Sequence, residues 1–187
     1  MTQWAINRLS KAIERGAVIA STTDTIWGFA CHPLQPESVQ RILDIKQRSM
    51  TKGLILLSSE LAYCRPYLSD GFSKQNVNLP DHKNHPVTWL IPAHENCPVW
   101  LTGHFSTIAV RITDHPLIKL ICDQMQSPVV STSANRQGKP PVRNAGLARR
   151  RFKHCIDSIV GGYVPGTGKP SEIRSLTTNC IIRTIQS

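Results

Sequence analysis

Apolar residues at helical spacing mark four segments of the chain. The first runs from Trp4 to Ile13, and Gly16 follows it as a stop signal. The second is predicted to begin at Pro36, because proline fits the first turn of a helix, and to continue to Lys46 with its apolar residues on one side. The other two cover residues 117–125 and 142–152, and the last of these is strongly basic. We therefore expect four helices spread over the whole chain.

Short apolar runs lie between these helices and predict strands. They cover residues 17–21, 54–57, 87–91, 108–112, 129–132, 156–160, 172–176 and 180–185. Residues 60–67 indicate a short helix interrupted by Pro66, whereas residues 69–86 and 161–170 are typical of loops, the second lying over a site. Strands and helices alternate without a linker or an internal repeat. This predicts a single α/β domain over residues 1–187, with a mixed sheet covered by helices.

Composition narrows the class of partner. Hydrophobic residues make up 40% and charged residues 18% of the 187 positions, which excludes a disordered or fibrous chain. The formal net charge of +10 favours a polyanion such as a nucleotide, pyrophosphate or RNA, although a gain in solubility explains the same surplus. We find no secretion signal and no apolar stretch of the roughly 20 residues that a membrane span needs. These features predict a cytoplasmic protein that has no membrane contact.

The cysteines indicate packing and not metal or disulfide chemistry. None of the six forms a Cys-x-x-Cys pair, so they are expected to be small buried residues in a reducing compartment. A group of histidines near Cys97 (His82, His85 and His94) lacks the paired spacing of metal ligands, and no metal held by the protein is predicted.

Two polar segments in the first third of the chain carry candidate chemistry. Residues 21–28 follow the first strand with three threonines, an acid and a glycine, a pattern typical of a capped turn or of a site rich in hydroxyl and backbone donors. Lys46-Gln47-Arg48 ends the second helix, where the helix dipole favours cations in any case. The functional alternative is a phosphate clamp, because Arg supplies a planar fork and Lys a point charge.

Two further polar segments occur in the second half. Ser131-Thr132-Ser133-Ala134-Asn135 leaves an apolar strand with small polar groups that can hold phosphate, ribose or an amino acid. A serine hydrolase is disfavoured, because no histidine neighbours Ser133 and no nucleophile elbow is present. Residues 161–171 are rich in glycine, but Tyr163 and Pro170 stand where a P-loop needs a glycine and a hydroxyl.

Taken together and in this order, these segments resemble the YrdC-type threonylcarbamoyl-AMP synthases. The resemblance extends from about Ile6 to Arg183, and its most specific part is the Lys-x-Arg and Ser-x-Asn pair with LTGHFSTIAVRITDHPL between the two. The segments that carry it are Thr23-Asp24-Thr25-Ile26-Trp27-Gly28, Lys46-Gln47-Arg48, Val110-Arg111, Ser133-Ala134-Asn135 and Pro170-Ser171-Glu172-Ile173. It implies the short bacterial form, with a twisted mixed sheet curved around a positively charged cavity.

The resemblance also implies a nucleotidyltransferase reaction. L-threonine takes up bicarbonate to form a carbamate, whose oxygen attacks the α-phosphate of ATP to give L-threonylcarbamoyladenylate and pyrophosphate for threonylcarbamoyladenosine modification of tRNA. Mg²⁺ enters with ATP, while tRNA and a threonylcarbamoyl-transferase complex are further partners that the resemblance leaves open. The implied threonine-pocket residues are Thr23, Arg111, Ser133 and Ser171. The implied ATP-site residues are Lys46, Arg48, Thr107, Asn135, Arg143 and Arg183, with catalytic charge stabilisation from Lys46 and Arg48.

Several positions depart from the family pattern. Thr22 stands where the family usually has Pro, and Lys52 and Leu57 replace an Asn and a His of its longer members. Asn84-His85-Pro86 replaces the usual Pro-Gly-Pro run. Two rival functions therefore stay open, namely a paralogue with another substrate and a non-catalytic RNA-binding protein of the same fold, which the basic helix favours.

Arg111 has a structural alternative of its own. It closes an apolar strand, so its guanidinium needs an anionic partner. That partner is either the threonine carboxylate or an acid close in sequence, Asp114 or Asp123.

Overall fold

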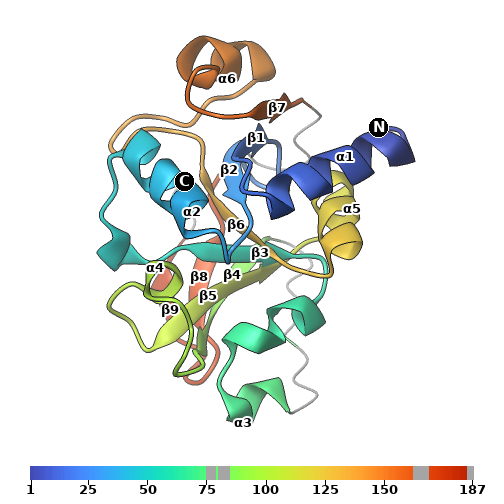
Figure 1. Cartoon of the computed structure of the whole chain (residues 1–187). Helices are drawn as coiled ribbons and strands as arrows, with labels where there is room; N and C mark the ends of the chain where they lie inside the picture. Colours follow the sequence, from blue (N-terminus) through green and yellow to red (C-terminus); the bar gives the residue numbers. More distant parts are fainter. Residues whose placement is uncertain (75–78, 80–84, 162–168, 185–187) are drawn as a thin grey trace.

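Helices and strands alternate along the chain in the computed structural model, which describes residues 1–74, 79, 85–161 and 169–184 (Figure 1). The α-helices are α1 (Gln3–Glu14), α2 (Pro36–Lys46), α3 (Asp70–Ser73), α4 (Val99–Thr102), α5 (Pro116–Met125) and α6 (Ala145–Phe152), and the 3₁₀ helices are η1 (Met50–Lys52) and η2 (Leu61–Tyr67). The strands are β1 (Ile19–Ser21), β2 (Gly28–Cys31), β3 (Ile55–Ser58), β4 (Val87–Pro92), β5 (Thr107–Ile112), β6 (Val129–Ser133), β7 (Ser158–Val160), β8 (Glu172–Ser175) and β9 (Ile181–Arg183). Every strand and helix predicted from the apolar pattern is confirmed, most of them with shifted ends.

The nine strands of the described residues form one mixed sheet in the order β7-β1-β2-β6-β3-β5-β4-β8-β9. The pairs β1/β7, β3/β5 and β4/β8 are parallel, and the other neighbours are antiparallel. The central strands therefore join segments that lie far apart in the sequence, as where Gly28 pairs with Ser133. This confirms the predicted α/β class.

Several local predictions were incomplete or wrong. The sequence does not predict β2, because its four residues begin at a glycine directly after a polar turn. The predicted helix 142–152 begins instead at Ala145, since the Asn144 side chain caps it by accepting a hydrogen bond of 2.9 Å from the Leu147 N–H. The short helices α3 and α4 were also missed, because one turn is too short for a periodic signal. Most of the predicted loop 161–170 lies outside the described residues.

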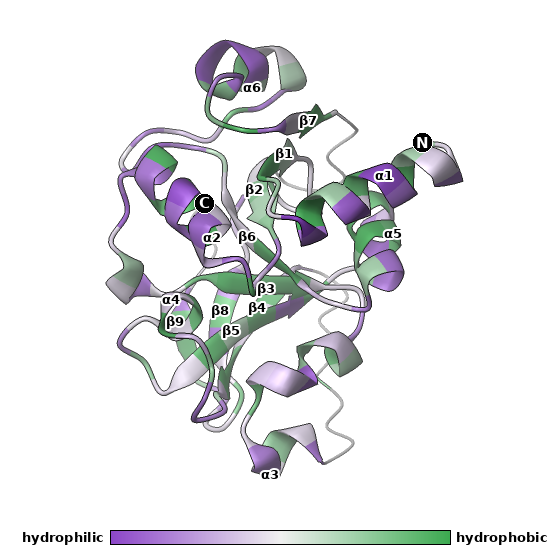
Figure 2. Cartoon of the chain, viewed as in Figure 1, coloured by the Kyte–Doolittle hydropathy of each residue, from purple (hydrophilic) through white to green (hydrophobic). Residues whose placement is uncertain are grey.

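The two faces of the sheet are covered differently. One face packs against α2 and α6, and Phe29 of β2 meets Phe152 of α6 edge to face with ring centroids 4.9 Å apart. On the other face Leu57 and Val129 pack under α1 and α5, which lie side by side in Figure 1. In Figure 2 the apolar colouring follows the strands, whereas the helices carry both polar and apolar residues. Side chains alternate along a strand, so residues of the second face that lie beyond α1 and α5 are free to line a site.

The cysteine prediction holds for only part of the set. Cys31, Cys64 and Cys122 are buried, and burial raises the pKa of each thiol to about 12. Cys155 and Cys180 are exposed, contrary to the prediction. The apolar neighbours of Cys180 belong to β9, an edge strand whose three residues are exposed, so local hydrophobicity does not indicate burial there.

Each helix among the described residues is too short or too polar to cross a membrane.

Candidate functional site

A cavity of about 490 Å³ opens on the second face of the sheet, beyond α1 and α5. Its size lies within the range of about 300–1,000 Å³ that small-molecule sites occupy. Alternate residues of β5 (Thr107, Ala109 and Arg111) form its floor, since Ile108 and Val110 point to the opposite core. The β1–β2 connection, residues 48–55, the end of β6 and the strands β8 and β9 supply its other walls.

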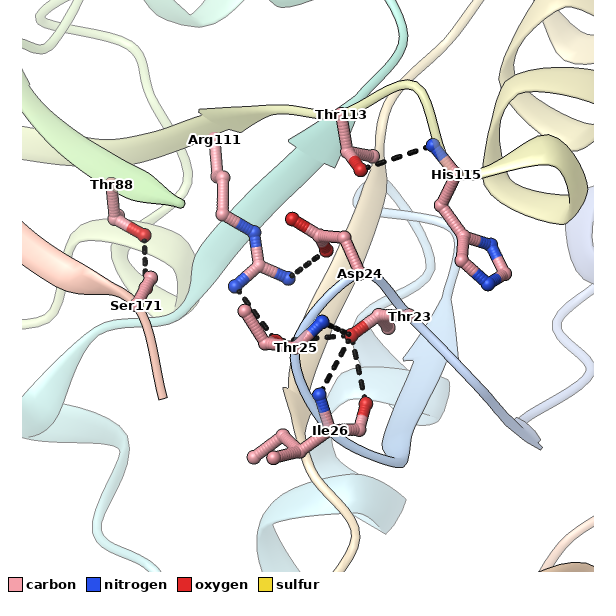
Figure 3. A network of polar contacts seen from close by, with 9 residues as sticks. All are labelled: Thr23, Asp24, Thr25, Ile26, Thr88, Arg111, Thr113, His115 and Ser171. Atoms are coloured by element: carbon pink, nitrogen blue, oxygen red, sulfur yellow. Dashed lines mark hydrogen bonds and ion pairs between the residues drawn. The ribbon is translucent and has the colours of Figure 1, made fainter. Parts of the chain in front are cut away.

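The β1–β2 connection is held by the Thr23 hydroxyl (Figure 3). Its Oγ1 donates to the Ile26 carbonyl at 2.7 Å and accepts from the Thr25 and Ile26 N–H groups at 3.2 and 3.3 Å. The Thr23 and Thr25 hydroxyls also lie 3.1 Å apart, and both residues line the cavity. This segment is therefore a capped turn and a cavity wall at once, so the two alternatives read from its sequence do not exclude each other.

Arg111 reaches the same connection from β5. Its side chain is 6% exposed, its Nη2 lies 3.1 Å from Oδ1 of Asp24, and its Nη1 donates to the Thr25 hydroxyl at 3.2 Å. Neither Asp114 nor Asp123 is its ion-pair partner, so the sequence-based alternative named the wrong acids. Asp123 instead lies 2.8 Å from Lys119 on α5, whereas Asp24 comes close to Arg111 only through the fold.

The electrostatics leave Arg111 able to take another anion. Burial lowers the pKa of Arg111, Asp24 raises it in opposition, and the nearby Arg183 lowers it further. The buried Nε of Arg111 makes no hydrogen bond within the described residues. Arg111 is thus ion-paired to Asp24 while a second guanidinium, that of Arg183, lies near enough to act on it, an arrangement that favours binding of a further carboxylate.

Lys46 lies behind the cavity wall, buried to 3% exposure at the end of α2. Its Nζ donates to the carbonyl and hydroxyl of Ser133 and to both oxygens of Asn135, the last at 3.2 and 3.0 Å. All these acceptors are neutral, and the described residues give Lys46 no carboxylate within 4.0 Å. Burial, with a smaller effect of the Arg48 charge, lowers the Lys46 pKa from 10.5 to about 8. The Lys46 ammonium group therefore has no anionic partner among the described residues.

Arg48 and Arg183 bring two more cations to the cavity. Arg48 follows a left-handed Gln47 (φ 53°) that ends α2, and its Nη2 donates to the Gly53 carbonyl at 3.0 Å. Arg183 donates to the Ser171 carbonyl at 2.8 Å, and the Ser171 hydroxyl lies 2.7 Å from that of Thr88. Burial lowers the pKa of both arginines, and for Arg48 the charge of Arg183 contributes. Anions are therefore favoured between them.

The structure gathers most of the sequence-predicted site residues in this one cavity. Those that line it are Thr23, Arg48, Thr107, Arg111, Ser133, Asn135, Ser171 and Arg183. Lys46 reaches it through Ser133 and Asn135, whereas Arg143 is exposed and lies outside the described lining.

Sequence reasoning missed several cavity residues. Phe105 and Ile182 line the cavity although each is 60% exposed. Phe105 stands in the specific motif between the Lys-x-Arg and Ser-x-Asn pairs, which was the available signal. Nothing in the local sequence distinguishes Ile182 from a buried strand residue.

The cavity combines cations with hydroxyl groups, and among its described lining residues there is no Asp or Glu. It can hold phosphate and carboxylate groups by charge-assisted hydrogen bonds. Within the part of the chain that the structure describes, no group of three His, Cys, Asp or Glu side chains is placed to hold a metal ion.

Known proteins resemble this chain over nearly its whole length. The profile of the Sua5/YciO/YrdC family, described as telomere recombination, matches residues 11–184. A threonylcarbamoyl-AMP synthase of Coxiella burnetii is 38% identical over 179 residues, which cover 96% of both chains. The chain superposes on P. abyssi Sua5 complexed with L-threonine with a TM-score of 0.84 and 24% identity, covering 99% of this chain and 55% of that one. The superposition on E. coli YciO has a TM-score of 0.79 at 21% sequence identity, and it covers 98% of this chain and 90% of that one.

Proposed function

The chain belongs to the Sua5/YciO/YrdC family, and from this we propose that it acts as a threonylcarbamoyl-AMP synthase in tRNA modification. The enzyme joins L-threonine, bicarbonate and ATP and releases pyrophosphate, as a nucleotidyltransferase. The observation that carries the proposal is that one cavity combines a hydroxyl-rich pocket around Arg111 with the cations Arg48 and Arg183, which have no carboxylate partner among the described residues. The relatives named threonylcarbamoyl-AMP synthase support the same assignment.

The pocket around Arg111 suits the amino acid. A guanidinium can bind the threonine carboxylate through two parallel N–H groups, and the nearby Arg183 adds positive charge. The hydroxyls of Thr23, Ser133 and Ser171 are the available partners for the threonine hydroxyl and amine. Because P. abyssi Sua5 has been seen with L-threonine, this pocket is the first to test.

The cations at the end of α2 suit the triphosphate. Arg48 lies in the wall and Lys46 just behind it, so their charges can stabilise the negative charge that builds up as the carbamate oxygen attacks the α-phosphate. No protein side chain need act as a nucleophile, since the carbamate supplies the attacking oxygen. Positioning and charge stabilisation would account for catalysis. Thr107, Asn135 and Arg183 of the cavity lining would supply further contacts to ATP. The proposed ATP contact of Arg143 concerns a side chain outside the described lining.

Mg²⁺ is proposed as a companion of ATP. It prefers oxygen ligands and retains several waters, so phosphate oxygens can hold it without a protein carboxylate cluster. The donor set agrees with this, because the described cavity lining offers hydroxyls and amides but no acid. The reaction belongs in the cytoplasm, where the tRNA pathway takes up its product, and tRNA or a transferase complex would receive that product.

The test is pyrophosphate release by the purified protein, with threonine, bicarbonate and Mg²⁺ omitted one at a time. We expect release only when all three accompany ATP, because the carbamate is the nucleophile. Equal rates after rigorous removal of bicarbonate would refute the proposal. Salt-dependent RNA binding without ATP consumption would favour the rival RNA-binding function instead, and stimulation by another amino acid would indicate a paralogue.

A further inference from the structure

The partner of Arg111 is the feature that the proposed reaction leaves unused. Asp24 is absent from the described cavity lining, yet its Oδ1 lies 3.1 Å from Nη2 of Arg111. The Asp24 side chain is 19% exposed and that of Arg111 6% exposed, so the contact is largely removed from water. Figure 3 shows the carboxylate on the far side of the guanidinium from Thr88 and Ser171. Asp24 therefore contacts Arg111 from behind the binding surface.

The Asp24 backbone is itself held in place. It lies between Thr23 and Thr25, and the Thr23 hydroxyl binds the Thr25 N–H as well as both backbone groups of Ile26. Thr25 holds Nη1 of Arg111 while Asp24 holds Nη2. Two adjacent residues of one fixed turn thus contact the guanidinium, Thr25 through a hydrogen bond and Asp24 through an ion pair without hydrogen-bond geometry. The Nε of Arg111 makes no hydrogen bond within the described residues.

We infer that Asp24 is a positioning residue, which orients the Arg111 guanidinium for the carboxylate of the amino-acid substrate. The inference rests on the proposed function and adds to it a residue that never touches the substrate. An arginine on a strand has several rotatable bonds, and a grip on a carboxylate requires one orientation of its plane. Fixing that orientation before binding removes an entropic cost that the substrate would otherwise bear.

A purely structural role predicts a different result. Removing one partner of a buried ion pair destabilises the fold, because the remaining charge is left buried without compensation. If Asp24 served only the fold, its removal would lower the melting temperature and leave threonine affinity untouched in the folded fraction. If it positions Arg111, threonine affinity falls and ATP affinity does not, since Asp24 contacts neither Lys46 nor Arg48.

The experiment is a double-mutant cycle with Asp24→Ala, Arg111→Ala and the pair, read by calorimetric titration of threonine and of ATP. We expect Asp24→Ala to weaken threonine binding about tenfold in the wild-type background, within the usual coupling of contacting residues. In the Arg111→Ala background the same change should have no further effect. Asp24→Asn keeps an oxygen acceptor and nearly the same volume, so it should retain part of the threonine affinity that Asp24→Ala loses. If Asp24→Ala fails to fold, Asp24→Asn replaces it in the cycle.

The matched control is Asp157→Asn, which breaks a more exposed arginine pair, with Arg41 at 2.7 Å, away from the cavity. It should leave threonine affinity unchanged. If Asp24→Ala and Asp24→Asn both bind threonine as tightly as wild type, the inference is overturned while the proposed function stands. The same holds if Asp24→Ala weakens threonine binding equally in the wild-type and Arg111→Ala backgrounds. Absence of threonine binding by the wild-type protein would overturn the proposed function and the inference with it.

Discussion

Replacing the buried Lys46 by Met should change how the stability of the protein depends on pH. In the folded state burial and Arg48 hold the Lys46 pKa at about 8, against 10.5 in the unfolded chain. Between these values the unfolded state binds more protons, so the free energy of unfolding rises with pH. The shift corresponds to about 3 kcal/mol, at roughly 1.4 kcal/mol per unit. Below pH 8 both states are protonated and this gain is absent.

Met retains an apolar stem of similar length but carries no charge, so it should remove the effect. Urea unfolding of both proteins at several pH values from 7 to about 10.5 gives the difference in unfolding free energy. We expect the unfolding free energy of wild type, relative to that of Lys46→Met, to rise by up to about 3 kcal/mol across this interval. The thiol groups titrate in both proteins, so their contribution cancels in the comparison. Parallel curves for the two proteins would show that Lys46 has an ordinary pKa, and the argument would then be wrong.

Three further predictions concern the cavity and its support. Arg48→Ala should weaken ATP binding about ten- to a hundredfold while threonine affinity stays, because one charge-assisted contact is lost; unfolding with full residual activity would refute this. Arg111→Lys should fail to restore the threonine affinity lost in Arg111→Ala, at least roughly thirtyfold by calorimetry, since an ammonium lacks the planar fork; full rescue by lysine would refute it. Gly103→Ala should destabilise the fold strongly in thermal unfolding, since Gly103 has φ +66° and an added Cβ would lie 2.3 Å from the Thr51 carbonyl oxygen. Gly138→Ala, at φ +74° with nothing within 4 Å, is the control and should cost only about 1–2 kcal/mol.

Local sequence predicted the elements where a repeated signal existed. The helix from Pro36 to Lys46 was predicted to the residue, because a proline at its start and apolar spacing along one side agree. The strand β2 could not be found in the same way, since Gly28 and the threonines before it indicate a turn. Its place between β1 and β6 depends on pairing with Ser133, which no local pattern encodes.

The site was predictable through its motifs and not through its contacts. Motif resemblance named Lys46 and Asn135 separately, and the fold places the Lys46 ammonium 3.0 Å from the Asn135 side-chain oxygen. The pairing of Arg111 with Asp24 was missed, because the search for acids stopped at residues near in sequence. The predicted role of each site residue awaits the binding and activity measurements above.

The central strand pairings have a consequence for how the protein folds. The cavity draws on segments from Thr23 to Arg183, and it is complete only when β2, β6, β3 and β5 have paired. Such non-local pairings make folding slow, because chain entropy is lost before contacts compensate for it. No single hairpin or helix pair can hold the site by itself, so partly folded chains should not bind substrate. Threonine and ATP should then select the fully paired sheet, and their presence should protect even distant strands from proteases.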